Sequence, residues 1–448
     1  MNPRSIAIPW GLDGEILEWR TPEAWPVPEV VEPDLSAPIV DYPSALESAL
    51  AEIDVLRSDG ELGTGKRVAI VVDDPTRWTP VRAALPPILE RLQRAGVMDA
   101  DITICVGVGR HHAVDDAAMR ERVGPEVVSR YRCESPPVDH LAAYRDLGTT
   151  PEGIPVRVFR PVADADLRIL IGSVLPHLQA GFGGGYKLIF PGTSHRTTLS
   201  ALHRVGIGAG EAGRRLGESA GENPMRRAIA SAASLLGPCV SVSHLLGAKG
   251  EVLEIAAGVP ESVQDRLAAS AARRFRAPDA PAADLIVAGN HPWPGDPMMS
   301  FKVLLNHRAS VRPGGVMIGL FWATESEIDR SFSLPALRAI SATGAFGGWS
   351  IERGLLLTDR LMSIFHPASE FMIRWARELV VDRTILVYSP LLRERVGKRL
   401  GPIRIHDDPM RLWQDAAESL GTTIAPRIRV YPRAGLTYAP EPRSIPAR

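Results

Sequence analysis

Short runs of apolar residues alternate with helix-like segments along most of this chain. The runs RVAIVVDD (67–74) and DITICVGVG (101–109) have the composition of buried strands. Between them lies PPILERLQRAG, in which Pro86 and Pro87 predict the start of a helix and Gly96 its end. Such alternation is typical of βαβ units, so the chain is predicted to be an α/β protein with mainly parallel sheets.

The length of the chain, 448 residues, is too great for one ordinary hydrophobic core. An Ala- and Pro-rich stretch, RAPDAPAAD (276–284), precedes a fresh strand at LIVAG (285–289) and marks a domain boundary. We therefore predict an N-terminal α/β domain over 1–275 and a C-terminal α/β domain over 283–448, with an active-site cleft between them. We also allow for the final segment packing back on the N-terminal domain.

The charge balance argues for a small-molecule ligand. Lys and Arg number 51 against 52 Asp and Glu, and no dense basic run occurs, so nothing predicts binding to nucleic acid or to an anionic membrane. Three cysteines, Cys105, Cys133 and Cys239, are too few for a disulfide framework or a Cys-rich zinc site. Prolines and acids interrupt the N-terminal residues, and no apolar run approaches the ~18 residues of a membrane span, so we expect a cytoplasmic protein.

Ionisable residues follow three of the predicted strands. In open α/β sheets, ligands bind beyond the carboxyl ends of the strands, so these groups are candidates for one shared cleft. Taken singly, each is better explained as a solvated loop residue, and an arginine next to two aspartates is well explained as an ordinary salt bridge; ionisable groups at three successive strand ends favour the shared cleft. The candidates are Asp73, Asp74 and Arg77 after the first strand, His111 and His112 after the second, and His177 after LRILIG (167–172).

A glycine-rich loop, AGFGGGYKLIFPG, follows His177. Consecutive glycines cost conformational entropy, so Gly183, Gly184 and Gly185 indicate positive φ or a close approach of another group to the backbone. Lys187 beside them is a candidate anion ligand or nucleophile. The loop does not match a Walker A sequence, because Tyr186 stands where that pattern requires glycine. Composition and spacing leave open a Schiff-base lysine enzyme and a non-catalytic small-ligand-binding protein.

Four segments resemble the nickel-pincer lactate racemase family, which comprises 2-hydroxyacid racemases and epimerases. PHLQAGFGGGYKLIFPG resembles the signature PH-x-x-AGFSGGRK-x-x-x-PG of that family. DDPTRWTP (73–80), GRHH (109–112) and FKVLLNHRASVRPGG resemble three further elements, and the four occur in the same order over most of the chain. The resemblance implies an isomerase that racemises or epimerises a 2-hydroxy acid such as lactate.

The resemblance also implies a cofactor, the nickel complex of pyridinium-3-thioamide-5-thiocarboxylate mononucleotide. Lys187 matches the lysine that is joined to this cofactor through a thioamide, and His203 matches the single protein ligand to nickel. Asp74 matches an aspartate beside the cofactor, and the glycines 183–185 match the loop that its mononucleotide approaches. Cofactor-synthesis proteins are then implied as partners.

The remaining matches concern the substrate. His111 and His177 match the paired acid and base, and Arg77 and Lys302 match groups that hold the substrate carboxylate. The implied reaction moves the Cα hydrogen as hydride through a planar 2-keto acid. Three departures from the family pattern, Tyr186, Met298 and His112, concern the substrate pocket and the assignment of the second histidine, so the particular 2-hydroxy acid stays open.

Overall fold

The structure is a computed structural model. It describes residues 4–53, 62–109, 113–137, 140–207, 215–293, 295, 297–331, 375, 378–421 and 425–439. The chain divides into two compact units. Leu35–Arg274 forms the first, here called the central unit, and Met1–Asp34 together with Phe275–Arg448 forms the second, here called the terminal unit.

Within the described residues, a six-stranded sheet forms the centre of the central unit. The strand order is β13-β12-β9-β4-β5-β6, and every neighbouring pair is parallel except β12 and β13. This arrangement confirms the predicted α/β class with a mainly parallel sheet. The strands are β4 (Val68–Asp73), β5 (Ile102–Gly107), β6 (Arg132–Glu134), β9 (Leu167–Ser173), β12 (Cys239–Leu246) and β13 (Val252–Gly258).

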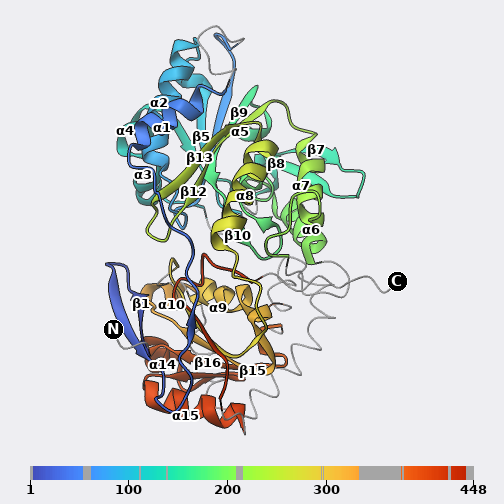
Figure 1. Cartoon of the computed structure of the whole chain (residues 1–448). Helices are drawn as coiled ribbons and strands as arrows, with labels where there is room; N and C mark the ends of the chain where they lie inside the picture. Colours follow the sequence, from blue (N-terminus) through green and yellow to red (C-terminus); the bar gives the residue numbers. More distant parts are fainter. Residues whose placement is uncertain are drawn as a thin grey trace. The chain divides into compact units, whose positions relative to one another are not determined.

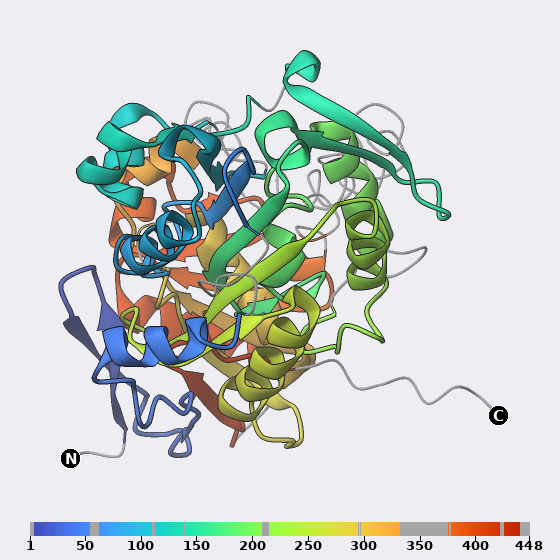
Figure 2. The ribbon, with the colours of Figure 1, turned by 90° about the horizontal axis from the view of Figure 1, so that it is seen from above.

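Helices cover both faces of this sheet. The blue-to-teal helices lie on one side and the green helices on the other, as Figure 1 and the perpendicular view in Figure 2 show. The first group comprises α1 (Tyr42–Leu50), α2 (Val81–Arg94), α3 (Asp116–Val123) and α4 (Pro125–Arg130), and the second α6 (Arg196–Ile207) and α7 (Pro224–Ala233). The helix α5 (Arg160–Ala163), the helix α8 (Pro260–Phe275) and the hairpin of β7 (Tyr144–Thr149) and β8 (Pro155–Phe159) complete the unit.

Burial on both faces explains why the strands are apolar throughout. In β4, Ile70 and Val72 pack with the layer of α1 and α2, whereas Ala69 and Val71 pack with the layer of α6 and α7. A half-exposed strand would alternate apolar and polar residues, but a parallel strand covered on both sides does not. The continuous run VAIVV is therefore what this position in the sheet requires.

The helix α2 begins earlier than the sequence predicts. We expected Pro86 and Pro87 to mark its start, but it spans Val81–Arg94 and contains both prolines. Val81 and Leu85 are buried in the core along with later residues of the helix, so the buried apolar face extends to its first turn. Tertiary packing therefore overrides the local preference of proline. The predicted end is confirmed, because Gly96 follows the C-cap with a φ of 83°.

The terminal unit contains a second, mainly parallel sheet. Among the described residues it has seven strands in the order β17-β18-β16-β15-β14-β19-β3, with β17 antiparallel to β18. The strands are β3 (Glu29–Val30), β14 (Ala283–Gly289), β15 (Val311–Leu320), β16 (Thr384–Tyr388), β17 (Arg399–Leu400), β18 (Ile403–His406) and β19 (Ile428–Tyr431). Its helices include α9 (Pro297–Asn306), α10 (Glu325–Ser331), α14 (Pro390–Val396) and α15 (Pro409–Leu420).

The first residues of the chain pack differently from our prediction, which placed all of 1–275 in one domain. β1 (Ser5–Trp10) and β2 (Glu15–Arg20) form a hairpin, and Ile8 and Trp19 pack in the core of the terminal unit. β3 pairs in parallel with β19, which itself lies beside β14, so both ends of the chain share this sheet. The described residues up to 439 therefore stay with the terminal unit. Within the described ranges, no helix is long and apolar enough to cross a membrane.

Candidate active site

The predicted strand ends lie side by side in the central unit. β4 lies between β9 and β5, in register with both: Asp73 pairs with Gly107, and Val72 with Ile171. The carboxyl ends of three parallel strands therefore meet at one edge of the sheet. His111 and His112 lie outside the described residues, but Gly109 just before them donates its N–H to the Gly192 carbonyl, 2.8 Å away, in the segment that follows the glycine loop.

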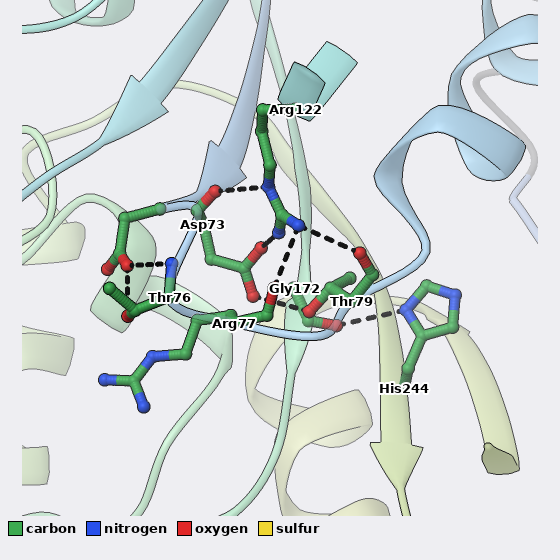
Figure 3. A network of polar contacts seen from close by, with 8 residues as sticks. Asp73, Thr76, Arg77, Thr79, Arg122, Gly172 and His244 are labelled. Carbon is green, nitrogen blue, oxygen red and sulfur yellow. Dashed lines mark hydrogen bonds and ion pairs between the residues drawn. The ribbon is translucent and has the colours of Figure 1, made fainter. Parts of the chain in front are cut away.

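Arg122, on α3, fixes the loop that follows β4. Its guanidinium pairs with the Asp73 carboxylate and also donates to the backbone oxygens of Asp73, Arg77 and Thr79, at 3.0–3.1 Å (Figure 3). The second Asp73 oxygen accepts the Thr79 hydroxyl at 2.6 Å. Burial raises the pKa of Asp73, while Arg122 and Thr79 lower it by stabilising the carboxylate. Arg122 therefore holds both ends of the loop.

Asp74 and Arg77 occupy the middle of this loop. Asp74 is buried, and its carboxylate accepts the backbone N–H and the hydroxyl of Thr76, which closes a local turn. The Arg77 guanidinium points away from the Asp73 carboxylate in Figure 3, where Arg122 fills the position of ion partner. The geometry therefore does not support the explanation of Arg77 as the salt-bridge partner of Asp73.

The glycine loop has the special conformation that its sequence indicates at two of three positions. Gly184 and Gly185 have φ values of 77° and 59°. A Cβ on Gly184 would lie 2.6 Å from a Val174 methyl group, so glycine is required there for space as well as for conformation. Gly183 has no positive φ, and a Cβ there would make ordinary contacts at 3.6 Å or more. Its predicted cofactor contact stays a prediction.

The start of α7 binds the carbonyl groups of the loop. The Arg226 side chain is buried and donates to the oxygens of Ala180, Phe182, Gly183 and Gly184. Asn223, three residues earlier, donates to the Gln179 oxygen at 2.9 Å and accepts the Arg226 N–H, which caps the helix. Burial lowers the pKa of Arg226 to about 10, so the guanidinium stays charged at neutral pH. One buried cation thus orients four consecutive or near-consecutive peptide groups.

Lys187 lies on a short turn that packs against the sheet. This turn is the 3₁₀ helix η4 (Gly185–Leu188), and its last residue, Leu188, packs where the strand glycines leave room. A Cβ on Gly172 of β9 would lie 2.8 Å from a Leu188 methyl group, and one on Gly107 of β5 would lie 2.9 Å from the Leu188 oxygen. Leu188 therefore anchors this turn against β9 and β5, and its neighbour Lys187 is half-buried.

His177 and His203 are joined through Gln179. His177 lies in the short strand β10 (Pro176–His177), which pairs with β11 (Gly181–Phe182), and its Nδ1 accepts the N–H groups of Gln179 and Ala180 at 3.2 and 3.1 Å. His203 lies on α6 and is buried; its Nδ1 is 2.6 Å from the Gln179 side-chain oxygen. The structure therefore brings the predicted acid/base residue and the predicted nickel ligand to one buried glutamine.

A buried histidine, His244, lies behind the strand ends. Its Nδ1 contacts the Gly172 carbonyl at 3.1 Å and its Nε2 contacts the Tyr42 hydroxyl at 3.0 Å (Figure 3 shows the first of these). Because the carbonyl can only accept, Nδ1 carries the proton and Nε2 accepts from the tyrosine. Burial lowers the pKa of His244 from 6.5 to about 4.

This depressed pKa predicts a loss of stability in mild acid. Below pH 6.5 His244 becomes protonated in the unfolded chain, but in the folded chain it stays neutral down to about pH 4. The free energy of unfolding therefore falls between pH 6.5 and about 4. His244 contributes about 3 kcal/mol to this fall. In His244→Gln, the difference between urea midpoints at pH 7.0 and pH 4.5 should shrink. The exposed His140→Gln should retain the full difference, and equal pH dependence in both variants would contradict the prediction.

Lys302 belongs to α9 of the terminal unit. Its ammonium lies 3.4 Å from the Met299 sulfur and 5.6 Å from the centre of the Trp375 ring. A cation over an aromatic face is favourable, so Trp375 helps to hold the lysine. The predicted pairing of Lys302 with Arg77 on one substrate stays a prediction. The side chain of Met298 lies outside the described residues.

Comparisons with known proteins relate residues 17–214 to a family model described as the lactate racemase N-terminal domain. A lactate racemase from Thermoanaerobacterium thermosaccharolyticum is 24% identical over 271 residues, and one from Lactiplantibacillus plantarum is 31% identical over 144. Residues 17–214 therefore resemble the N-terminal domain of lactate racemases. The alignments cover 58% and 32% of this chain, and 60% and 34% of the lengths of those two relatives.

Solved structures show a likeness in fold over nearly the whole chain. The lactate racemase apoprotein from Thermoanaerobacterium thermosaccharolyticum superposes with a TM-score of 0.76 and 18% identity, over 98% of this chain and 100% of that one. A crystal structure of a Thermotoga maritima protein matches with a TM-score of 0.59 and 14% identity, over 85% of this chain and 95% of that one. The fold of this chain is therefore shared with that apoprotein over nearly its full length.

Three site residues were not found from the sequence: Arg122, Gln179 and Arg226. Each acts on the loops that carry the family motifs, through contacts to backbone or to another side chain. Gln179 lies inside the quoted motif PHLQAGF, but at a position where the family pattern allows any residue. The two arginines lie in helices, α3 and α7, that carry other arginines as well, so no local signal distinguishes them.

Proposed function

We propose that this chain is a racemase or epimerase of a lactate-like 2-hydroxy acid, with the nickel-pincer nucleotide as its cofactor. The observation that carries the proposal is the link from His177 through Gln179 to His203. This link lies in a segment that matches the lactate racemase N-terminal domain, and the glycine loop and Lys187 follow the same strand. A Schiff-base lysine enzyme or a plain binding protein needs neither histidine at such a position.

The described side chains suit a metal ion that receives most of its ligands from a cofactor. Within the described residues, no group of three or more His, Cys, Asp and Glu side chains could hold a metal ion by itself. His203 would supply one imidazole to nickel, a metal for which imidazole is a suitable ligand. Lys187 would hold the cofactor, by a covalent bond or by its charge, and Asp74 and the glycines 183–185 would lie beside it.

The chain's own residues would bind the substrate and move its hydroxyl proton. When bound, the cofactor supplies a hydride acceptor for the Cα hydrogen. Arg77 and Lys302 would hold the substrate carboxylate, since a guanidinium can bind it through two hydrogen bonds. His177 and His111 would take and return the hydroxyl proton from the two sides of a planar 2-keto acid.

The described arrangement fixes which ring nitrogen of neutral His177 carries the proton. Because two backbone N–H groups point at Nδ1, neutral His177 carries its proton on Nε2 and is placed to donate a hydrogen bond there to the substrate oxygen. The group that gives up a proton is the imidazolium, which becomes the Nδ1–H form when Nε2 loses its proton. The group that takes a proton on Nε2 is the same Nδ1–H form, so in both directions Nδ1 gives up its contacts with those N–H groups.

Racemisation in deuterated water tests the reaction. We expect single enantiomers of 2-hydroxy acids to be inverted with hydrogen retained at Cα, because a hydride carried on a cofactor does not exchange with solvent. The protein is produced together with the cofactor-synthesis proteins, and the product Cα is examined by NMR and mass spectrometry. Protein produced without them is the control and should be inactive. Extensive deuterium at Cα would show simple deprotonation and would rule out the hydride route.

A further inference from the structure

Gln179 is fully buried and makes contacts with both candidate histidines. Its side chain has no solvent-exposed surface, and its backbone oxygen accepts a hydrogen bond from the Asn223 side chain at 2.9 Å. On α6, Gly206 lies one turn after His203, and a Cβ there would lie 3.3 Å from the Gln179 Cβ. The absence of a side chain at Gly206 therefore leaves room for Gln179 against the helix.

The orientation of the Gln179 amide follows from the two groups that it meets on His203. The Gln179 Nε2 lies 3.3 Å from the His203 backbone oxygen, which can only accept a hydrogen bond. The amide nitrogen must therefore face that oxygen, and the amide oxygen faces His203 Nδ1 at 2.6 Å. Because the amide oxygen can only accept, neutral His203 carries its proton on Nδ1 and its lone pair on Nε2.

The same residue sets the opposite form of His177. The N–H groups of Gln179 and Ala180 both point at His177 Nδ1, so the lone pair of that ring is on Nδ1 and its proton is on Nε2. A metal ligand needs a lone pair, and a group that binds the substrate oxygen through a hydrogen bond needs an N–H. The contacts of Gln179 thus leave His203 with a lone pair on Nε2 and His177 with an N–H on Nε2.

We propose that Gln179 is the positioning residue of this site: its side chain sets His203 as an Nε2 ligand, while its backbone sets His177 as an Nε2–H donor. The proposal rests on the proposed function for the two roles, but the two ring forms are properties of the protein without cofactor. Partners that hold the second nitrogen of a ligating imidazole fix its orientation and raise its basicity.

Nitrogen-15 NMR of the histidine rings in the protein without cofactor is the direct test. We expect His203 to be protonated on Nδ1 and His177 on Nε2, with each ring assigned from the spectrum of its glutamine variant. In Gln179→Leu, which removes the amide but keeps a buried apolar side chain, His203 should lose its preference for Nδ1–H. In Gln179→Glu, the carboxylate can still accept from Nδ1, so the preference should remain.

Nickel content after production with the cofactor-synthesis proteins is the second measurement. The nickel content of Gln179→Leu should be lower than that of the wild type by a factor of about ten or more, which is the usual effect of removing a residue that holds a metal ligand. Gln179→Glu should retain more than Gln179→Leu. The matched control is Gln93→Leu, which removes the amide of a partly buried glutamine in the same unit that contacts Asp99 and Tyr131 instead of the site. It should leave nickel content unchanged.

The outcomes separate this inference from the proposed function. His203 protonated on Nε2 in the wild type, or unchanged ring forms together with unchanged nickel content in Gln179→Leu, would overturn the role of Gln179. The wild-type measurement decides even if Gln179→Leu fails to fold. A wild type with the expected ring forms but no nickel and no racemisation would support the positioning of the rings and would instead overturn the proposed function.

Discussion

Replacing Arg226 with methionine is expected to lower the free energy of unfolding of the central unit by about 3–5 kcal/mol. Methionine nearly fills the space of the aliphatic stem but donates no hydrogen bond. The oxygens of Ala180, Phe182, Gly183 and Gly184 would lose a charged donor in a buried site. Chemical denaturation measures the loss, and hydrogen exchange should show faster opening of residues 178–185.

The neighbouring Arg227 provides a matched control. It lies on the same helix but is exposed, and its guanidinium donates to the Gly221 and Glu222 oxygens at 2.8 and 2.9 Å near the surface. Arg227→Met should change the free energy of unfolding by about 0.5 kcal/mol or less, as is usual for surface positions. Equal losses in the two variants would mean that the buried carbonyl contacts of Arg226 contribute little.

Replacing His177 with glutamine is expected to lower kcat/KM for racemisation by about 1,000-fold, within the range of general acid–base catalysis. Glutamine is similar in size and can form hydrogen bonds, but it does not exchange a proton at neutral pH. Two enantiomers that differ at one centre have equal free energies, so the loss must be the same in both directions. Polarimetry starting from each enantiomer measures both rates.

Cofactor content distinguishes lost catalysis from a lost site. His177→Gln should keep the nickel content of the wild type, because the proposed nickel ligand is His203. The exposed His140→Gln should keep both activity and nickel. Retention of more than a tenth of the wild-type rate in His177→Gln would contradict an acid/base role, and a parallel loss of nickel would place His177 with the cofactor instead.

The class of fold and the meeting of three strand ends at one edge of the sheet could be predicted from the sequence. The apolar runs at 67–74, 101–109 and 167–172 became β4, β5 and β9, and the order of these strands places their following loops together. This prediction succeeded because parallel strands buried on both faces need unbroken apolar sequence, and because all their carboxyl ends lie on one edge.

The supporting contacts of the site could not be predicted in the same way. Arg226 and Arg227 are adjacent and identical in chemistry, yet one is buried under the glycine loop and the other is exposed. Asp73 likewise pairs with Arg122, 49 positions away, and not with the nearby Arg77. Which arginine is buried, and which one pairs with Asp73, depends on the helix face that lies against a loop distant in sequence.

Local sequence by itself determined the strands, the glycine conformations at Gly184 and Gly185, and the motifs that resemble those of lactate racemases. These features depend on side-chain burial and backbone sterics within a few residues. The tertiary structure alone decided that residues 4–34 join the terminal unit, that α2 begins before its prolines, and that Gln179 links His177 to His203. The physical reason is that burial and hydrogen bonding between distant segments outweigh local preferences of less than a few kcal/mol.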